Sequence, residues 1–390
     1  MYCRFCGKQI MDDSVFCRYC GKNQGASVGV FSSSPSDDDY DFDLDEFFSD
    51  AVNQKRTEEE IEKMFDIRNG VLVKYKDWFG GNENVVIPNG VTIIGEEAFQ
   101  FCQNLTHVTI PAGVTTIEKR AFTGCKKLKN VVFPEGLSII EERAFCECDS
   151  LKSISISRGI TRIEEGAFQN CTNLTTVSIS EGLIHIGDMA FWECSSLSTI
   201  NLPQSLTTIE GCAFSHCVSL TNITLPNNVS QIGGGAFAKT GVISLTIPRS
   251  TISIGSFQGM EKLASITVAY GNPVYHSSGN CLIESASKTV IGGCKNSIIP
   301  TDGSVTSIGS FAFDGCSGLT SITIPNTITS ISNSAFAECG LTSITIPYSV
   351  QRIYEDAFYN CSRLYSIYVP NTTYVERNAF SDCPGRVTRY

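Results

Sequence analysis

The hydrophobic positions of this chain recur at a fixed interval over most of its length. An Ala-Phe pair returns every 22 or 23 residues, apart from one shortened copy and one longer gap. A constant period of this size indicates a repeat architecture in which each unit is one supersecondary structure. The phenylalanines that mark about twelve copies are Phe99, Phe122, Phe145, Phe168, Phe191, Phe214, Phe237, Phe257, Phe313, Phe336, Phe358 and Phe380.

Two short hydrophobic segments precede the Ala-Phe pair in each unit, as in LTTVSISEGLIHIGDMAFWEC (174–194). Val177 and Ile179 alternate with polar residues, which predicts a strand with one buried face. A proline often follows this strand and ends it, because proline has no N–H to donate. Leu183 and Ile186 form a second inward-facing stretch. One unit is too small to bury a core alone, so the sequence predicts a β-rich solenoid of stacked units.

This unit resembles the BspA-like class of leucine-rich repeats, which occurs mainly in bacteria. The resemblance covers about residues 67–390 and implies a leucine-rich repeat solenoid of 22–23-residue units. The segment 67–88, which contains Asn69-Gly70, resembles the entry hairpin that caps such arrays. An insertion at 269–304 contains the stretches CLIE and TVIGGC, which predict a β-hairpin that extends one repeat. The resemblance implies binding to proteins or surface glycans rather than catalysis.

Two CxxC pairs at the start of the chain carry the clearest chemical signal. Each pair supplies two thiolates from one turn, and each is followed by Gly-Lys. Four sulfurs with no open position suit one structural Zn²⁺ in a ribbon of residues 1–25. Iron in the same four-sulfur site and a pair of disulfides are the alternatives. The segment resembles the minimal zinc ribbons at the N-termini of many bacterial proteins, and the ligands would be Cys3, Cys6, Cys17 and Cys20.

Residues 26–66 form an acidic linker that carries thirteen acidic and three basic side chains. Its stretch Asp37–Asp50 alternates acids with aromatic residues. This pattern fits either a solvated spacer or a short motif that docks in the groove of a partner. Thr57 and Glu60 have the spacing of a capping box, which predicts a short helix as far as about Phe65.

Ten further cysteines lie three residues after a repeat phenylalanine, so stacking places them in a column. A column of thiols suggests either a metal or redox ladder or simply small buried side chains at a bend. We favour buried, reduced cysteines, since reduced cysteine is among the most buried residue types. The ten are Cys102, Cys125, Cys148, Cys171, Cys194, Cys217, Cys316, Cys339, Cys361 and Cys383.

The outward positions of the first strand in each repeat are mostly Ser, Thr and Asn, which suit exposed strand positions. The last three repeats break this pattern by adding several tyrosines and arginines, which are enriched among residues that dominate interface energetics. We therefore predict a partner-binding patch at that end, centred on Tyr365 and Tyr368. Its further members are Tyr348, Arg352 and Arg363.

The remaining features favour a non-catalytic protein. Four histidines occur at unrelated repeat positions, and no phosphate-binding loop or nucleophile motif is present. We expect a scaffold for protein–protein interaction, with a cell-surface adhesin that binds host proteins or glycans as the alternative. Nucleic-acid binding through the ribbon is weaker, since residues 67–390 are nearly neutral. Without an apolar run of membrane length or a signal-like start, we expect a cytoplasmic location, or the cell surface by an unrecognised route.

Overall fold

The chain divides into two compact units, Met1–Asp50 and Ala51–Tyr390. The computed structural model describes residues 57–76 and 83–390, all of which belong to the second unit. The predicted zinc ribbon, with its four cysteines, and the acidic stretch Asp37–Asp50 lie outside the described residues.

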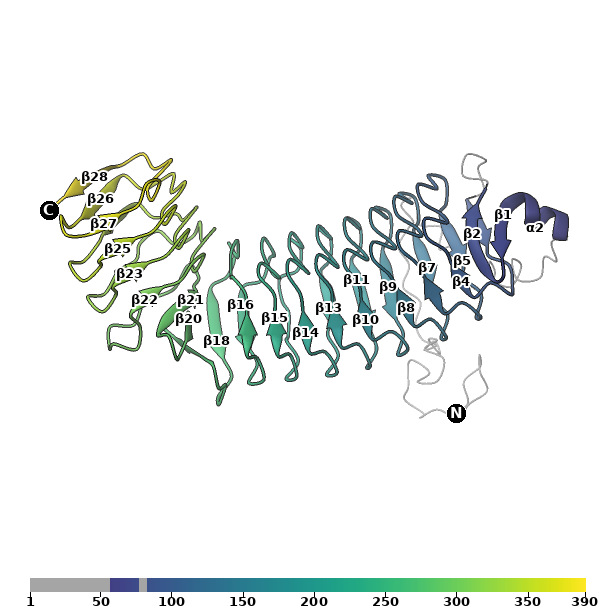
Figure 1. The fold of residues 1–390 in the computed structure, drawn as a ribbon, viewed down its shortest axis with the longest axis horizontal. Coiled ribbons are helices and arrows are strands. Elements are labelled where there is room, and N and C mark those ends of the chain that lie inside the picture. Colours follow the sequence, from purple (N-terminus) through teal and green to yellow (C-terminus); the bar gives the residue numbers. More distant parts are fainter. Residues whose placement is uncertain (1–56, 77–82) are drawn as a thin grey trace, which may run out of the picture. The chain divides into compact units, whose positions relative to one another are not determined.

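The second unit is a stack of turns whose short strands form two rows (Figure 1), and some turns contribute a strand to only one of these rows. Neighbouring strands of the first row pair in parallel with an offset of one repeat, as Thr176 with Thr199. The described strands of this row are β3 (Asn84–Val86), β5 (His107–Thr109), β7 (Asn130–Val132), β9 (Ser153–Ile156), β11 (Thr176–Ile179), β13 (Thr199–Asn201), β16 (Ser244–Ile247), β18 (Ser265–Val268), β24 (Ser343–Thr345), β26 (Ser366–Val369) and β28 (Arg386–Arg389).

The second row shows that the stack has about fourteen turns, two more than the phenylalanines predict. The entry hairpin and the insertion each add a turn that carries no Ala-Phe pair. Among the described residues this row contains β2 (Val71–Tyr75), β4 (Ile93–Ile94), β6 (Thr116–Ile117), β8 (Ile139–Ile140), β10 (Arg162–Ile163), β12 (His185–Ile186), β14 (Thr208–Ile209), β15 (Gln231–Ile232), β17 (Ser253–Ile254), β21 (Thr289–Gly292), β22 (Ser307–Ile308), β23 (Ser330–Ile331), β25 (Arg352–Ile353) and β27 (Tyr374–Val375).

The core lies between the two rows and contains a file of stacked phenylalanine rings. Phe122 and Phe145 are parallel within 6° with ring centroids 5.0 Å apart. Most rings of the file are fully buried, whereas Phe380 at its C-terminal end is partly buried, and the repeats add alanines, leucines and isoleucines beside the rings. Tyr75 extends the file by one ring, since it stacks on Phe99 at 5.1 Å. Neighbouring repeats therefore stabilise one another, because the ring of each repeat packs against the ring of the next.

The turn that carries each Ala-Phe pair is held by the adjacent turn. The N–H of Phe122 donates to the carbonyl of Ala144 at 2.8 Å, one repeat later. Residues with positive φ flank the pair, including non-glycine residues such as Arg120 (φ 53°) and Glu147 (φ 58°). The bonds between adjacent turns stabilise this left-handed backbone, which L-residues otherwise adopt at a cost.

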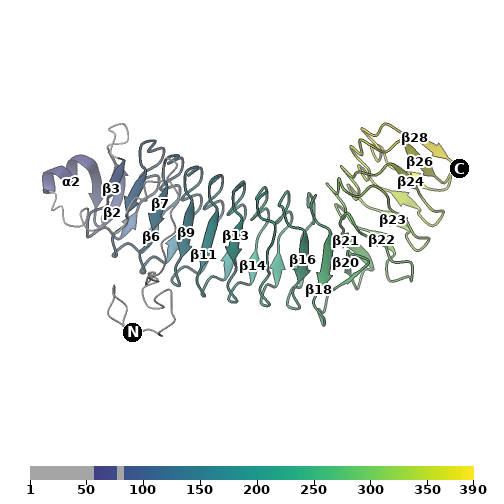
Figure 2. The ribbon, with the colours of Figure 1, turned by 180° about the vertical axis from the view of Figure 1, so that it is seen from behind.

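One end of the stack is closed by a helix and a hairpin (Figure 2). The helix α2 (Glu58–Met64) has a capping box formed by Thr57 and Glu60, as their spacing predicts, and Ile61 and Met64 pack on the core. β1 (Phe65–Arg68) then pairs with β2 in antiparallel fashion. The turn between them places Asn69 and Gly70 at positive φ, the conformation that Asn-Gly favours.

The insertion contains three antiparallel strands rather than the predicted two. β20 (Cys281–Glu284) pairs with β21, and β19 (Tyr275–Ser278) pairs with the other edge of β20. Two glycines let the insertion join the core. A Cβ on Gly293 would lie 2.0 Å from the ring of Phe313, and one on Gly292 would lie 3.0 Å from that of Phe257. The backbone at Gly292 and Gly293 thus occupies the position in this turn that a stacked phenylalanine ring occupies in the other repeats.

Candidate interaction surface

The outward positions of the first row form a strip of hydroxyl groups along the stack. Ser155, Thr176 and Ser178 are exposed, while their neighbours within the strands, Ile154, Ile156 and Val177, are buried, as the alternation predicts. Neighbouring hydroxyls bond across the ladder, as Thr246 and Thr267 do at 2.8 Å. The strip carries little charge, and these cross-strand bonds explain its composition without a ligand.

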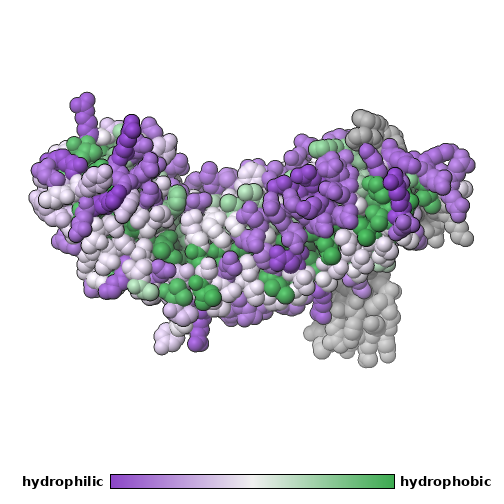
Figure 3. All heavy atoms as spheres, viewed as in Figure 1, coloured by the Kyte–Doolittle hydropathy of each residue, from purple (hydrophilic) through white to green (hydrophobic). Residues whose placement is uncertain are grey.

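Charged residues gather instead on the turns before the Ala-Phe pairs. Hydrophilic side chains cover the repeats around β7, β9 and β11 (Figure 3). Several of them form ion pairs across repeats. Lys119 Nζ lies 3.1 Å from Glu142 Oε2, and Arg143 Nη2 lies 2.8 Å from Glu165 Oε1. Since the charges neutralise one another at the surface, this region has the character of a solvated face.

Tyr365 and Tyr368 interrupt the hydroxyl strip near the C-terminal end. Tyr368 is an outward residue of β26 and Tyr365 precedes that strand; their exposed fractions are 44% and 66%. Arg363 lies in the preceding turn, is exposed, and forms no ion pair with any described residue. These three predicted residues therefore share one stretch of surface around the start of β26.

Arg352 lies in the other row of strands, so it does not join Tyr365 and Tyr368. It belongs to β25, where its Nε donates to Glu376 Oε1 at 2.8 Å. Its guanidinium also lies over two rings, 4.6 Å from the centroid of Tyr354 and 5.3 Å from that of Tyr374. The hydrogen bond with Glu376 raises the pKa of Arg352. Because its donors and its charge are engaged within the chain, Arg352 is less available to a partner.

Tyr348 lies between the two rows, in the turn that follows β24. Its ring meets the ring of Tyr390 edge-on, with centroids 5.2 Å apart. The hydroxyl of Tyr390 donates to the carbonyl of Ile346 at 2.6 Å and fixes that ring. Tyr348 remains 67% exposed, so its ring stays accessible to a partner although it packs against Tyr390.

The cysteine column is a ladder of hydrogen bonds in the core. The thiol of Cys125 donates to the carbonyl of Phe99 at 3.0 Å, and the thiol of Cys171 donates to that of Phe145 at 3.2 Å. Burial raises the pKa of these thiols and keeps them protonated. All ten cysteines are buried except Cys383, which is half-buried. This geometry matches the prediction of buried thiols at a bend.

Two further observations apply to residues 57–76 and 83–390. No group of three or more His, Cys, Asp or Glu residues there is placed to hold a metal ion. No helix there combines the length and the apolar character needed to cross a bilayer. The predicted zinc ligands lie outside these ranges, so the zinc site stays a prediction.

One known protein family matches this chain over almost the whole solenoid. Three overlapping stretches, residues 79–198, 184–299 and 287–388, match the BspA type leucine rich repeat region (6 copies). No curated protein matches the chain.

Two solved structures of bacterial proteins share the fold. A leucine-rich cell surface protein from Faecalibacterium prausnitzii is 27% identical, with a TM-score of 0.58, over 83% of this chain and 91% of that protein. A leucine-rich repeat protein from Bacteroides ovatus is 28% identical, also with a TM-score of 0.58, over 82% and 88% of the two chains. Together with the repeat geometry, the matched stretches establish that the chain belongs to the BspA-type leucine-rich repeat family.

Proposed function

We propose that this protein is a non-catalytic scaffold whose solenoid binds a protein partner. The observation that carries the proposal is the exposed pair Tyr365 and Tyr368 on an otherwise small and hydroxylated strip. Large aromatic side chains supply contact area at a low cost in conformational entropy, which is why they dominate many interfaces. Arg363 beside them adds an exposed positive charge that a partner can engage.

The chain offers a matched control for a test of this patch. Ile243 and Thr246 occupy, in the repeat of β16, the same places as Tyr365 and Tyr368 in the repeat of β26. Ile243 is 52% exposed, so its removal also deletes apolar surface. Wild type, the variant Tyr365→Ser with Tyr368→Ser, and the variant Ile243→Ser with Thr246→Ser are used as bait for cross-linked partners in lysate of the native cell.

We expect the tyrosine variant to lose the proteins that wild type captures, while the control retains them. Both variants should unfold at about the temperature of wild type, because all four side chains are exposed. Equal capture by all three baits would contradict the patch.

A second candidate is a cell-surface protein that binds host proteins or glycans. It is supported by the Faecalibacterium prausnitzii relative, which is described as a cell surface protein. Fractionation with protease shaving of intact native cells separates the two candidates. Cleavage on intact cells would favour the surface role, whereas protection until lysis would favour the cytoplasmic scaffold.

We also propose that Cys3, Cys6, Cys17 and Cys20 hold one structural Zn²⁺. The support is their spacing, since two CxxC turns supply four thiolates and leave no position for substrate. A closed site of this kind contributes folding energy rather than chemistry. Nucleic-acid binding through this segment remains the weaker alternative, and a steep salt dependence of DNA or RNA affinity is its test.

A further inference from the structure

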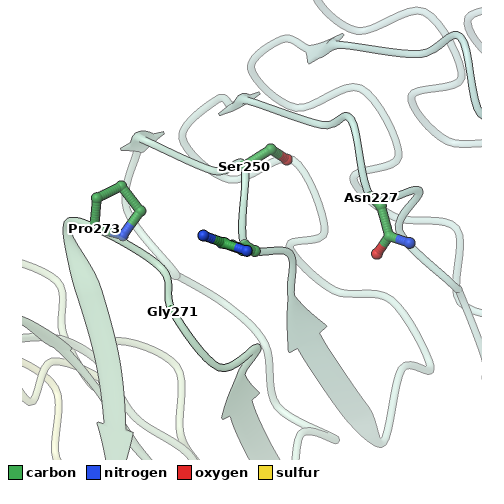
Figure 4. A pocket seen from close by; sticks show the side chains of 5 residues that line it. Asn227, Ser250, Gly271 and Pro273 are labelled. Atoms are coloured by element: carbon green, nitrogen blue, oxygen red, sulfur yellow. The ribbon is translucent and has the colours of Figure 1, made fainter.

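A pocket of about 650 Å³ opens where three successive turns leave the first row of strands. Arg249 lines the pocket, and Figure 4 shows Asn227 on one side of the wall and Pro273 on the other. Ser250 and Gly271 complete the lining, so no acidic side chain is among the lining residues.

An equivalent turn two repeats earlier already binds a carboxylate that belongs to the chain. The side chain of Glu181 accepts the main-chain N–H groups of Gln204 and Ser205, each at 3.1 Å. The bond from Gln204 is the main cause that lowers the pKa of Glu181, and the charge of Arg158 adds to it. The main-chain N–H groups of this type of turn can therefore bind a carboxylate.

The turn at Arg249 has the same construction but lacks the acid. Pro248-Arg249-Ser250 corresponds to Pro203-Gln204-Ser205, and both serine hydroxyls donate to the equivalent carbonyl of the previous repeat at 2.7 Å. Asn227 stands where Glu181 stands in its own repeat. Among the described residues, the N–H groups of Arg249 and Ser250 have no hydrogen-bond acceptor. Two main-chain donors are thus left open in residues that line the pocket.

Arg249 adds a full positive charge to these donors. It forms no ion pair with any described residue. Its Nε would lie 3.2 Å from a Cβ on Gly271, whose φ of +81° is one that glycine adopts freely. Glycine at this place leaves room for the guanidinium beside the turn. A guanidinium presents planar N–H donors that match both oxygens of a carboxylate.

We propose that this pocket binds a carboxylate side chain, from Asp or Glu in an acidic segment of a protein partner, through Arg249 and the N–H groups of the Pro248–Ser250 turn. A peptide carboxylate is favoured over that of an acidic sugar because the internal equivalent is itself a glutamate side chain. Tyr270, next to Gly271, is fully exposed and offers an aromatic surface beside the pocket. The assignment goes beyond the proposed scaffold function and does not require the patch at Tyr365 to be the contact surface.

The test follows the side-chain Nε–H signals of the full-length protein labelled with ¹⁵N-arginine, during titration with N-acetyl-glutamate amide. N-acetyl-glutamine amide, which has the same shape without the charge, is the matched ligand. The variant Arg249→Gln identifies the signal of Arg249. We expect that signal to shift and saturate with the glutamate probe, and to shift at least fivefold less with the glutamine probe.

The variant Asn227→Glu supplies the missing acid from within the chain. Its Arg249 signal should start near the saturated position and no longer respond to the probe, while the variant Arg363→Gln should titrate as wild type does. An Arg249 signal that ignores the glutamate probe, or an Asn227→Glu variant that titrates like wild type, would overturn the site. Glucuronate that binds tenfold more tightly than the glutamate probe would overturn the choice of a peptide ligand.

Discussion

The thiol of Cys194 donates to the main-chain carbonyl of Phe168 across a repeat boundary, with 3.2 Å between Sγ and the oxygen. The same carbonyl accepts the N–H of Cys171 within its own repeat at 3.3 Å. Each cysteine of the column from Cys125 onward thus joins its turn to the previous one, beside the file of phenylalanine rings. The column contributes to the cohesion of the stack rather than to chemistry at a surface.

Replacing Cys194 with alanine should lower the free energy of unfolding by about 1–3 kcal/mol, since it removes a buried hydrogen bond and leaves a small void. Cys146 is the matched control because it is also buried, yet its thiol makes no hydrogen bond to any described residue. Cys146→Ala should therefore cost less. Chemical denaturation followed by circular dichroism measures both values, and an equal loss in the two variants would argue against the ladder.

Replacing Gly293 with alanine should cost roughly 2–3 kcal/mol, because the new Cβ would lie 2.0 Å from the buried ring of Phe313. At Gly113 a Cβ would meet only a carbonyl oxygen at 3.4 Å. The control Gly113→Ala should therefore change stability by less than about 1 kcal/mol. Thermal and chemical unfolding of both variants test the difference; a Gly293→Ala protein as stable as wild type would show that the insertion does not pack as described.

Asp314 should make the protein less stable at neutral pH than at mildly acidic pH. Burial, together with the negative charge of Glu338, raises the pKa of Asp314 to about 6, although the charge of Lys239 opposes the shift. The folded state therefore binds a proton that the unfolded state has released, and stability falls as pH rises from about 4 to 6. Because Asp314 is only half-buried, solvent screening reduces the expected effect to about 1–2 kcal/mol.

The variant Asp314→Asn removes this penalty. Its gain over wild type should be present at pH 7.5 and absent at pH 4, as measured by urea denaturation at the two pH values. A gain of the same size at both would refute the role of the ionised carboxylate.

Purified full-length protein should contain one zinc per chain, bound by the four N-terminal thiolates. A double variant, Cys3→Ser with Cys17→Ser, should lose the metal, while the melting transition of the solenoid stays within a degree or two because the stack has its own core. Elemental analysis and calorimetry give the two readings. Zinc retained by the double variant, or iron in its place in the wild type, would be inconsistent with the proposed site.

The period of the sequence predicts most of this fold because each repeat contributes the same buried side chains. Val177 and Ile186 point inward as their spacing indicates. Tyr75 was missed because the polar hydroxyl hides its equivalence to the phenylalanines, although its ring continues the file. The strand Tyr275–Ser278 was missed as well, since its residues are mostly polar and its pairing depends on the insertion.

The predicted patch shows where sequence proximity misleads. Arg352 and Tyr365 lie in adjacent repeats, yet Arg352 belongs to β25 of the second row, whereas Tyr365 directly precedes β26 of the first row. The sequence alone predicts the row of strands to which a residue belongs, because that row follows from its place in the repeat. The ion pair of Arg352 with Glu376 could not be predicted in this way, because it joins side chains 24 positions apart. The pocket at Arg249 likewise required knowing which turn N–H groups lack an acceptor.

The central claim is that the solenoid binds a protein through the surface around Tyr368. The most direct test places the photoreactive residue p-benzoylphenylalanine at position 368, and separately at position 246, the equivalent outward position of β16, in the native cell. The account predicts one discrete cross-linked protein from position 368 that is absent from position 246. The same products from both positions, or none from position 368, would contradict it.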